Sequence, residues 1–388
     1  MLKQLTLVAL ATTAFAQTQD LNATLTSTPE LSNLTTYLGM FPDILTTLSG
    51  VSNITILAPN NDAFGKLLAS PIGSQLASNP ALIQSVLTYH VLNGTYTSNQ
   101  ITDDVAFIPT LLTDPAYANV TGGQRVGVET EDDNVIIYSG LLQNSTVTQA
   151  DVQFTGGVVH IIDTVLTLPA NASTTAIAAN LTALAGALTT ANLVSAVDTA
   201  RDITVFAPTN AAFEAIGSVL ANATTQQLTD VLTYHVVNGT VAYSTTLQPG
   251  EQTVTTLNGG QLTIRVQDDG DVFVNGARVV LTDVLIANGV VHVIDNVLNP
   301  ANATAAPPTG DNADDTGSVQ FGGASSGNVP FTAGIPSPTG TIGGGNLSSG
   351  NATPTAGTQP SSGAMANTVI SGGLMGIAIG LGGVVLGL

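Results

Sequence analysis

The strongest feature of the sequence is a set of three blocks that occur twice, in the same order along the chain. The paired blocks lie at 55–64 and 204–213, at 87–95 and 232–240, and at 157–163 and 289–295. Matched blocks in one order indicate an internal duplication, which has to be recognised before any local pattern is interpreted. We therefore expect two copies of one domain, at 17–169 and 170–299.

The first block of each copy has the pattern of a strand that ends at a proline and is followed by a helix. A short apolar, β-branched run leads into Pro59 in one copy and Pro208 in the other. Proline cannot donate to a sheet ladder, so the strand is expected to end there. The next two residues of each copy suit the N-cap of a helix, namely Asn60 or Asn61 and Thr209 or Asn210.

The order of the remaining local patterns predicts the fold class. Apolar residues recur at helical spacing over 31–48, and Asn79-Pro80 suits the start of another helix. Antiparallel hairpins with acidic turns are expected at 125–138 and 261–274. Helices followed by antiparallel strands in each copy indicate an α+β fold.

These blocks resemble the fasciclin domain family, often called FAS1. The family pattern has a Thr-Val-Phe-Ala-Pro-Thr block, a central Tyr-His pair and a closing Gly-Val-Val-His-Val-Ile-Asp block. The second copy matches it nearly letter for letter, whereas the first has Ile56-Leu57 in place of Val-Phe. The resemblance covers roughly 30–299 and implies two tandem domains. Each would be a compact antiparallel β-sandwich or wedge flanked by several short helices.

The two copies differ in length between their histidines. His90 and His160 are 70 positions apart, whereas His235 and His292 are 57 apart, so the first copy has 13 extra residues. We place the excess near 107–121, where two prolines interrupt regular structure. A surface loop is expected there, either a neutral loop or a binding loop.

Both ends of the chain have the patterns of targeting segments. Residues 1–16 combine a charged start, an apolar run and a small-x-small cleavage pattern, which predicts a secretory signal peptide. The segment at 300–360 is rich in Gly, Ser, Thr and Pro, which predicts a disordered linker suited to an O-glycosylated stalk. The uncharged segment at 361–388 predicts a GPI-attachment signal at Ser362 or Gly363, with a transmembrane helix as the alternative.

Composition limits the functions open to this chain. Cysteine is absent, which removes thiol catalysis and thiolate metal sites. A formal net charge of −20 disfavours binding to nucleic-acid phosphates, and the sequence has no basic patch for anionic lipid. We therefore expect membrane association through a GPI lipid only, at the extracellular face of the plasma membrane or in the cell wall.

Asn-x-Ser/Thr sequons are frequent, and in a secreted chain they predict N-glycosylation wherever they are exposed. A thirteenth sequon, at Asn53, lies beside an expected strand and is the weakest candidate. The other candidates are Asn22, Asn33, Asn93, Asn119, Asn144, Asn171, Asn180, Asn222, Asn238, Asn302, Asn346 and Asn351.

All four histidines fall in the repeated blocks, so a histidine pair in each copy has to be considered as a metal or acid–base site. No cysteine and no repeated histidine–carboxylate cluster completes a set of three or four ligands. Buried histidines that hydrogen bond the protein explain the pattern better. The sequence predicts no catalytic residue, cofactor or metal site, and hence no enzyme.

The Tyr-His pairs, Tyr89-His90 and Tyr234-His235, are the candidates for interaction. Around this pair, animal fasciclin-like proteins are implicated in integrin recognition, and the resemblance would extend that role to these residues. The alternative is burial, with an aromatic ring packed at a helix end and a histidine bonded to the next turn.

The expected function is non-catalytic adhesion and matrix organisation by a glycoprotein of the cell surface or cell wall. Its partners would be surface or matrix proteins or glycans, and contact between copies of the chain is also open. Two rival classes remain at this point. One is a wall or coat glycoprotein without specific recognition, and the other is a small-ligand carrier that uses the histidine pairs.

Overall fold

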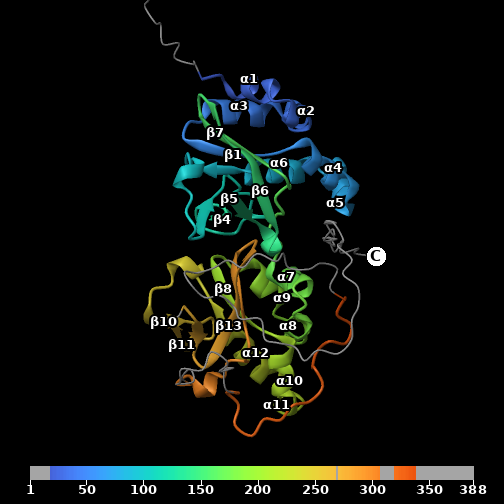
Figure 1. The fold of residues 1–388 in the computed structure, drawn as a ribbon. Coiled ribbons are helices and arrows are strands. Elements are labelled where there is room, and N and C mark those ends of the chain that lie inside the picture. The colour runs from blue at the N-terminus through green and yellow to red at the C-terminus, as the bar shows by residue number, and fades with distance from the viewer. Residues whose placement is uncertain (1–17, 268–269, 306–318, 338–388) are drawn as a thin grey trace, which may run out of the picture.

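The computed structural model describes residues 18–267, 270–305 and 319–337 of the chain, and these form two domains of the same architecture (Figure 1). The predicted signal peptide, most of the predicted stalk and the predicted GPI-attachment signal lie outside the described residues. Within those residues, no helix has both the length and the apolar character needed to cross a membrane.

The first domain begins with helices and continues with strands. Its helices are α1 (Leu21–Ser27), α2 (Ser32–Gly39), α3 (Pro42–Gly50), α4 (Asn61–Ala69), α5 (Pro71–Ser78) and α6 (Pro80–Tyr89), with single turns η1 (Pro29–Leu31), η2 (Ser98–Gln100) and η3 (Gly140–Leu142). Its strands are β1 (Ile54–Pro59), β2 (Val91–Asn93), β3 (Ala106–Pro109), β4 (Arg125–Glu131), β5 (Asn134–Tyr138), β6 (Asn144–Phe154) and β7 (Gly157–Ile162).

The second domain repeats this order. Its helices are α7 (Ala172–Ala178), α8 (Thr182–Thr190), α9 (Val194–Thr199), α10 (Asn210–Ala215), α11 (Gly217–Leu220) and α12 (Thr225–Tyr234), with turns η4 (Ser244–Thr246) and η5 (Pro300–Asn302). Its strands are β8 (Ile203–Pro208), β9 (Val236–Val237), β10 (Gly250–Thr255), β11 (Gln261–Val266), β12 (Val272–Val274), β13 (Ala277–Ile286) and β14 (Gly289–Ile294). The predicted α+β class and the tandem arrangement are therefore confirmed.

Each domain is built on one sheet of seven strands. The strand orders are β2-β1-β7-β6-β5-β4-β3 and β10-β11-β12-β13-β14-β8-β9. All pairs are antiparallel except β1 with β7 and β14 with β8. A bridge between Leu92 and Thr110, and one between Val237 and Thr256, joins the two edges of each sheet, so both sheets are barrel-like.

The first and third repeated blocks form the parallel pair of strands in each sheet. Gly157 opens β7 with φ +156°, and a Cβ there would lie 1.8 Å from the carbonyl oxygen of Ile54. Gly289 opens β14 in the same way, 1.8 Å from the carbonyl oxygen of Ile203. The glycine of the third block is therefore required by the close approach of the first block's strand.

The helix starts after β1 and β8 resolve the two cap alternatives. Asn60 Oδ1 accepts from the Ala63 N–H at 2.8 Å, and Thr209 Oγ1 accepts from the Ala212 N–H at 3.1 Å. The next residue in each copy reaches across the domain instead. Asn61 Oδ1 accepts from the Asn33 N–H at 3.0 Å, while Asn210 does the same for Ala183 at 3.0 Å. One polar residue therefore caps the helix, and its neighbour holds the helix α2 or α8 in place.

Both predicted hairpins are present. Strands β4 and β5 pair antiparallel across a turn in which Asp132 and Asp133 have positive φ. Strands β11 and β12 pair in the matching place. The helical pattern over 31–48 is divided between α2 and α3, because Pro42 has no N–H to continue a helix and instead occupies the first turn of a new one.

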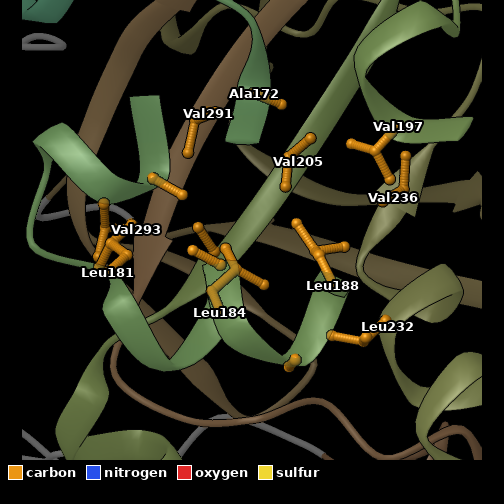
Figure 2. Packing of buried hydrophobic residues seen from close by; sticks show 14 of the residues in the cluster. Ala172, Leu181, Leu184, Leu188, Val197, Val205, Leu232, Val236, Val291 and Val293 are labelled. Carbon is orange, nitrogen blue, oxygen red and sulfur yellow. The ribbon is translucent and has the colours of Figure 1, made fainter. Parts of the chain in front are cut away.

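One part of the core of each domain lies between its helices and the sheet, and a second cluster is formed mostly by residues of the strands. Figure 2 shows this packing in the second domain, where Leu184 and Leu188 of α8 face Val205 of β8. Leu232 of α12 and Val291 of β14 belong to the same cluster. The apolar stripe predicted from helical spacing is thus the face that packs on the central strands.

Part of the predicted linker is packed on the second domain. Residues 319–337 run along its side, drawn orange to red in Figure 1, and Phe321, Val329 and Phe331 pack against its core cluster. A Cβ on Gly186 of α8 would lie 1.7 Å from the Phe331 carbonyl oxygen. The linker prediction was therefore wrong for 319–337, because a few aromatic and apolar residues in a polar segment find a surface of small residues to cover.

Candidate functional site

The Tyr-His pairs lie at the ends of α6 and α12, inside the protein. Tyr89 and Tyr234 are 0% and 1% exposed, and His90 and His235 are 4% and 2% exposed. As interaction candidates these four residues are corrected by the structure, because no partner can contact a side chain that the protein covers. The alternative of burial is confirmed.

The two tyrosine hydroxyls hydrogen bond the first residues of strands β4 and β11. The Tyr89 hydroxyl donates to the Arg125 carbonyl oxygen at 3.0 Å, and the Tyr234 hydroxyl donates to that of Gln261 at 2.7 Å. Tyr234 also accepts from Asn275 Nδ2 at 3.1 Å. Each hydroxyl therefore satisfies a backbone group at the start of the first strand of a hairpin.

His90 and His235 make the same two backbone contacts, and we call them the helix-end histidines. Nδ1 donates to the carbonyl oxygen four residues earlier, Val86 or Val231, at 2.7 Å in both domains. Nε2 accepts from the N–H of Leu166 or Leu298 at 2.9 Å in both domains. A carbonyl can only accept, so these contacts fix a neutral ring with its proton on Nδ1.

Burial has the expected effect on the helix-end histidines. Removal from water disfavours the charged ring and lowers the pKa of His90 and of His235 from 6.5 to about 4. Both rings are therefore neutral near pH 7. A neutral ring is what the Leu166 and Leu298 N–H groups require as an acceptor.

His160 and His292, which we call the strand histidines, have the opposite tautomer. Nε2 donates at 2.8 Å to the carbonyl oxygen of Tyr96 in the first domain and of Ala242 in the second. Nδ1 accepts from the N–H of Asp151 at 3.2 Å or Asp283 at 3.3 Å, both in the irregular middle of the neighbouring strand.

Every ring nitrogen of the four histidines therefore has a backbone partner. A histidine in this state cannot act as a base or metal ligand without first giving up a buried hydrogen bond. Among the residues that the structure describes, no group of three or more His, Cys, Asp or Glu side chains is placed to hold a metal ion. The repeated histidines are thus structural residues, which connect segments of the fold through hydrogen bonds to the backbone.

Most of the extra residues of the first domain belong to a joint between the domains. They lie in the connection at 110–124 between β3 and β4, which is ten residues longer than the matching connection at 256–260 in the second domain. Leu112, Ala118 and Val120 are buried. The expectation of a surface loop, neutral or binding, was therefore wrong for the end of this segment, because it packs on the second domain.

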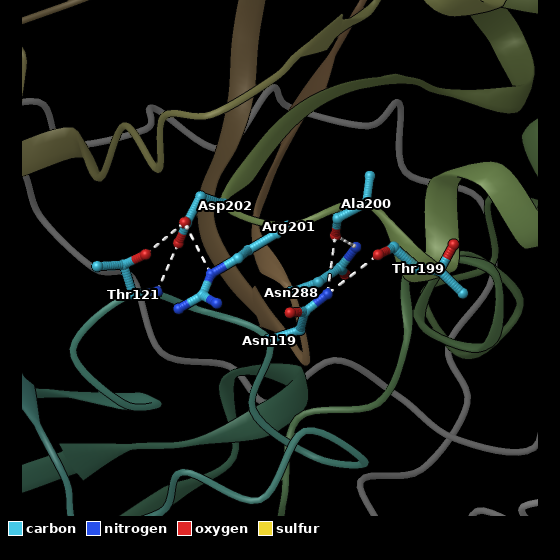
Figure 3. Close-up of polar contacts among 7 residues, drawn as sticks. All are labelled: Asn119, Thr121, Thr199, Ala200, Arg201, Asp202 and Asn288. Carbon is cyan, nitrogen blue, oxygen red and sulfur yellow. Dashed lines mark hydrogen bonds and ion pairs between the residues drawn. The ribbon is translucent and has the colours of Figure 1, made fainter.

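Polar contacts dominate one side of the joint (Figure 3). The Asn119 N–H donates to the Ala287 carbonyl oxygen at 2.6 Å, and Asn119 Nδ2 lies 3.1 Å from that of Thr199. The Thr121 N–H and hydroxyl donate to the two carboxylate oxygens of Asp202, each at 2.6 Å. Charged acceptors make the stronger hydrogen bonds, so Asp202 is the main polar anchor of the joint.

Aromatic rings form the other side. Phe107 of the first domain stacks on Tyr243 of the second, with ring centroids 4.4 Å apart. The Arg125 guanidinium lies 5.7 Å from the centre of the Tyr243 ring. Between the two sides, Gln124 Nε2 donates to the Ile286 carbonyl oxygen at 3.0 Å in a fully buried contact. The joint therefore combines aromatic packing with buried hydrogen bonds.

The basic residues in the described part of the chain are all held by the protein itself. Arg201 pairs with Asp202 at 3.3 Å, Arg278 with Asp271 at 2.9 Å, and Arg265 with Glu251. Lys66 and Arg125 donate to the carbonyl oxygens of Asp163 and Phe107. The surface offered to a partner is therefore acidic.

The predicted glycosylation sites fall into three groups. Asn33, Asn119 and Asn171 are half-buried, and Asn346 and Asn351 lie outside the described residues. The remaining candidates are exposed, namely Asn22, Asn93, Asn144, Asn180, Asn222, Asn238 and Asn302. Asn53 is also exposed, and its Oδ1 accepts from the Thr95 N–H at 3.0 Å.

Sequence reasoning missed the joint. Two signals pointed to it, namely the length difference between the copies and the absence of a Gly- or Pro-rich linker near 170. Neither signal names the residues involved. The matching connection of the second copy is too short for comparison, and the side-chain partners of Asn119 and the partner of Thr121 are some 80 positions away.

Comparison with known proteins gives the family. The fasciclin domain model matches residues 29–169 and 179–300. A fasciclin-like arabinogalactan protein of Arthroderma benhamiae is 39% identical over 312 residues, which is 80% of this chain and 73% of that protein. The fasciclin-like arabinogalactan protein elcF of Phaeosphaeria nodorum is 31% identical over 286 residues, 74% of this chain and 90% of that protein.

A solved structure is also similar. It is a FAS1 domain pair from the insect cell adhesion molecule fasciclin I, with 20% identity and a TM-score of 0.34. The similarity covers 70% of this chain and 98% of that one.

Proposed function

The chain belongs to the fasciclin domain family, and from that premise we propose that it is a non-catalytic adhesion and matrix-organising glycoprotein of the cell surface. The similarity to fasciclin-like arabinogalactan proteins supports an extracellular setting. Display of many copies on one surface would multiply weak individual contacts.

The observation that carries the non-catalytic part is the role of the histidines. Both ring nitrogens of each histidine are bonded to backbone groups. The two histidines of the second domain make the matching backbone hydrogen bonds. These contacts leave the small-ligand carrier without the histidine site on which it was based.

The joint supports a second part of the proposal, that the two domains act as one body. A pair with buried contacts between its domains presents a surface of fixed geometry, and binding then costs less ordering than binding by a flexible pair. Partners would be surface or matrix proteins or glycans, and contact between copies is included.

We further propose that the chain is held at the outer face of the membrane by a GPI lipid joined to Ser362 or Gly363. The support is the sequence pattern at 361–388. Mass spectrometry of the native protein before and after phosphatidylinositol-specific phospholipase treatment tests this. A glycolipid remnant on a peptide ending near Gly363 would support the anchor, and an intact Leu388 terminus would refute it.

The remaining rival is a coat glycoprotein that acts without recognition, and surface variants distinguish it from adhesion. Exposed apolar residues are available on both domains, namely Met40 and Leu68 on the first and Leu257 and Val280 on the second. Each is replaced by serine, and retention of displaying cells on wall preparations is measured at matched abundance and glycosylation. Loss of retention with one domain's variants supports recognition. Unchanged retention with all four supports the coat.

A further inference from the structure

One sequon of this chain is built into the contact between the domains. Asn119, Val120 and Thr121 form an Asn-x-Thr acceptor sequence at the end of the extra loop. A sequon is defined by its asparagine amide and its hydroxyl. In this structure both of those groups hydrogen bond the second domain.

Asn119 is held there by its backbone N–H, its backbone carbonyl oxygen and its side-chain nitrogen. Its N–H donates to Ala287, and its carbonyl oxygen accepts from the Asp202 N–H at 3.3 Å. Its side-chain nitrogen, Nδ2, lies 3.1 Å from the Thr199 carbonyl oxygen and 3.4 Å from that of Ala200. Figure 3 shows this side chain pointing at the two carbonyl groups.

The Thr121 hydroxyl is engaged as well. It donates to Asp202 Oδ2 at 2.6 Å, while the backbone N–H of the same residue donates to Oδ1. An enzyme that recognises the sequon needs this hydroxyl and an extended, accessible chain around it. Neither is available while the domains are docked.

Glycosylation would also remove what the joint uses. The reaction joins Nδ2 to the anomeric carbon of an oligosaccharide, releases one amide proton and breaks the glycosyl–phosphate bond of a lipid diphosphate donor. The product has a bulky sugar on the atom that now faces Thr199 and Ala200. We propose that N-glycosylation of Asn119 and docking of the two domains are mutually exclusive, so that this sequon controls the geometry of the pair.

The exposed sequons provide an internal control. Asn93 and Asn144 are exposed, and no hydrogen bond from either side-chain nitrogen appears among the contacts of the described residues. Neither side chain takes part in the hydrogen bonds of the joint. Differences in occupancy between Asn119 and these two sites therefore report on docking rather than on the host's capacity to glycosylate.

The test uses the full chain secreted from a yeast host. Site occupancy is read from peptides, and hydrogen exchange is followed on the peptide that contains 119–121, whose glycosylated and bare forms differ in mass. Slow exchange of the Asn119 and Thr121 amides is expected in the bare form and lost in the glycosylated form. Equal protection in the two forms would overturn the proposal.

If Asn119 of the wild type carries no glycan in any molecule, the Asp202→Ala variant provides the test. It removes both acceptors of Thr121, and occupancy at Asn119 should rise by about tenfold, the effect of about 1.4 kcal/mol on the undocked population. Occupancy at Asn93 should not change. Unchanged occupancy at Asn119 would refute the competition. Thr121→Ser, which keeps sequon and hydroxyl, is the matched control, and Tyr243→Ala replaces Asp202→Ala if the latter is not secreted.

Discussion

Thr121 of the first domain donates both its backbone N–H and its hydroxyl to the carboxylate of Asp202 in the second, at 2.6 Å each. Asp202 comes directly before β8 and has a positive φ, and the matching residue of the first domain is Asn53, also with positive φ. Asn53 accepts from Thr95 of its own domain. The duplicated position thus makes an internal contact in the first domain and a contact between domains in the second.

The aromatic side of the joint predicts how Tyr243 variants behave. Tyr243→Ala removes the ring that stacks on Phe107 and should cost about 3 kcal/mol, the usual loss for a buried aromatic. Tyr243→Phe keeps the ring and removes a hydroxyl without a hydrogen-bond partner in the described part of the chain, so it should be neutral or stabilising. Calorimetric unfolding measures both, and equal destabilisation by the two would contradict the packing role.

The helix-end histidines predict a loss of stability in acid. Burial lowers the pKa of His90 and His235 from 6.5 to about 4, so the unfolded chain binds more protons between these values. Stability should therefore fall as pH falls through this window, by up to about 3 kcal/mol for each histidine. Urea unfolding across the window tests this. In His90→Gln the slope should be smaller, and an unchanged slope would count against the assignment.

The tyrosines predict unequal costs for the same substitution. Tyr89→Phe leaves one carbonyl group, that of Arg125, without its donor and should cost about 1 kcal/mol. Tyr234→Phe leaves the Gln261 carbonyl and the buried Asn275 amide, and should cost about 2–3 kcal/mol. Denaturant unfolding ranks them, with the exposed Gln84→Ala as the reference. A larger cost for Tyr89→Phe would be inconsistent with these contacts.

The central parallel strands predict intolerance at Gly157. Gly157→Ala would place a Cβ 1.8 Å from the Ile54 carbonyl oxygen, so the two strands must separate, at a cost of more than about 4 kcal/mol. Gly39→Ala in α2 meets no atom within 4 Å and should be neutral or mildly stabilising. Secretion yield and melting temperature distinguish the two variants. A melting temperature near that of wild type for Gly157→Ala would exclude this reading of the glycine.

The acidic surface predicts the salt response of contact between copies. Beads that all carry the chain repel one another at low ionic strength. Their aggregation should increase as salt shortens the Debye length from about 30 Å at 0.01 M to about 8 Å at 0.15 M. Stalk-only beads are the control. Aggregation that decreases with salt would contradict this prediction. It would mean that copies attract one another through opposite charges, although the basic residues of the described chain already have partners within it.

The parts of the fold that depend on local chemistry were predictable from the sequence. Pro59, Asn60 and the acidic turn at Asp132 fix strand ends, a cap and a hairpin through contacts within a few residues. The burial of Tyr89 and His90 was one of two readings, since an amphipathic side chain suits a core and an interface alike. The choice between burial and an interface depends on the hydrogen-bond partners of the two side chains, Arg125 and Leu166. Only the folded chain brings these partners close.

The packed segment at 319–337 and the joint could not be predicted in this way. Composition at 319–337 is that of a linker, and its order depends on the small side chains around Gly186, far away in the sequence. The role of Thr121 likewise depends on Asp202, which is distant in the sequence. Contacts between distant segments depend on the folded shape of both domains. No short sequence pattern in either segment encodes that shape.

The central claim is that the paired domains make the cell surface adhesive. The most direct measurement compares host cells that display the full chain with cells that display only residues 300–388, matched for surface abundance. Retention of both on wall preparations is then recorded under flow. The account predicts clearly greater retention with the domains present. Equal retention of the two would contradict adhesion and leave a coat glycoprotein as the function.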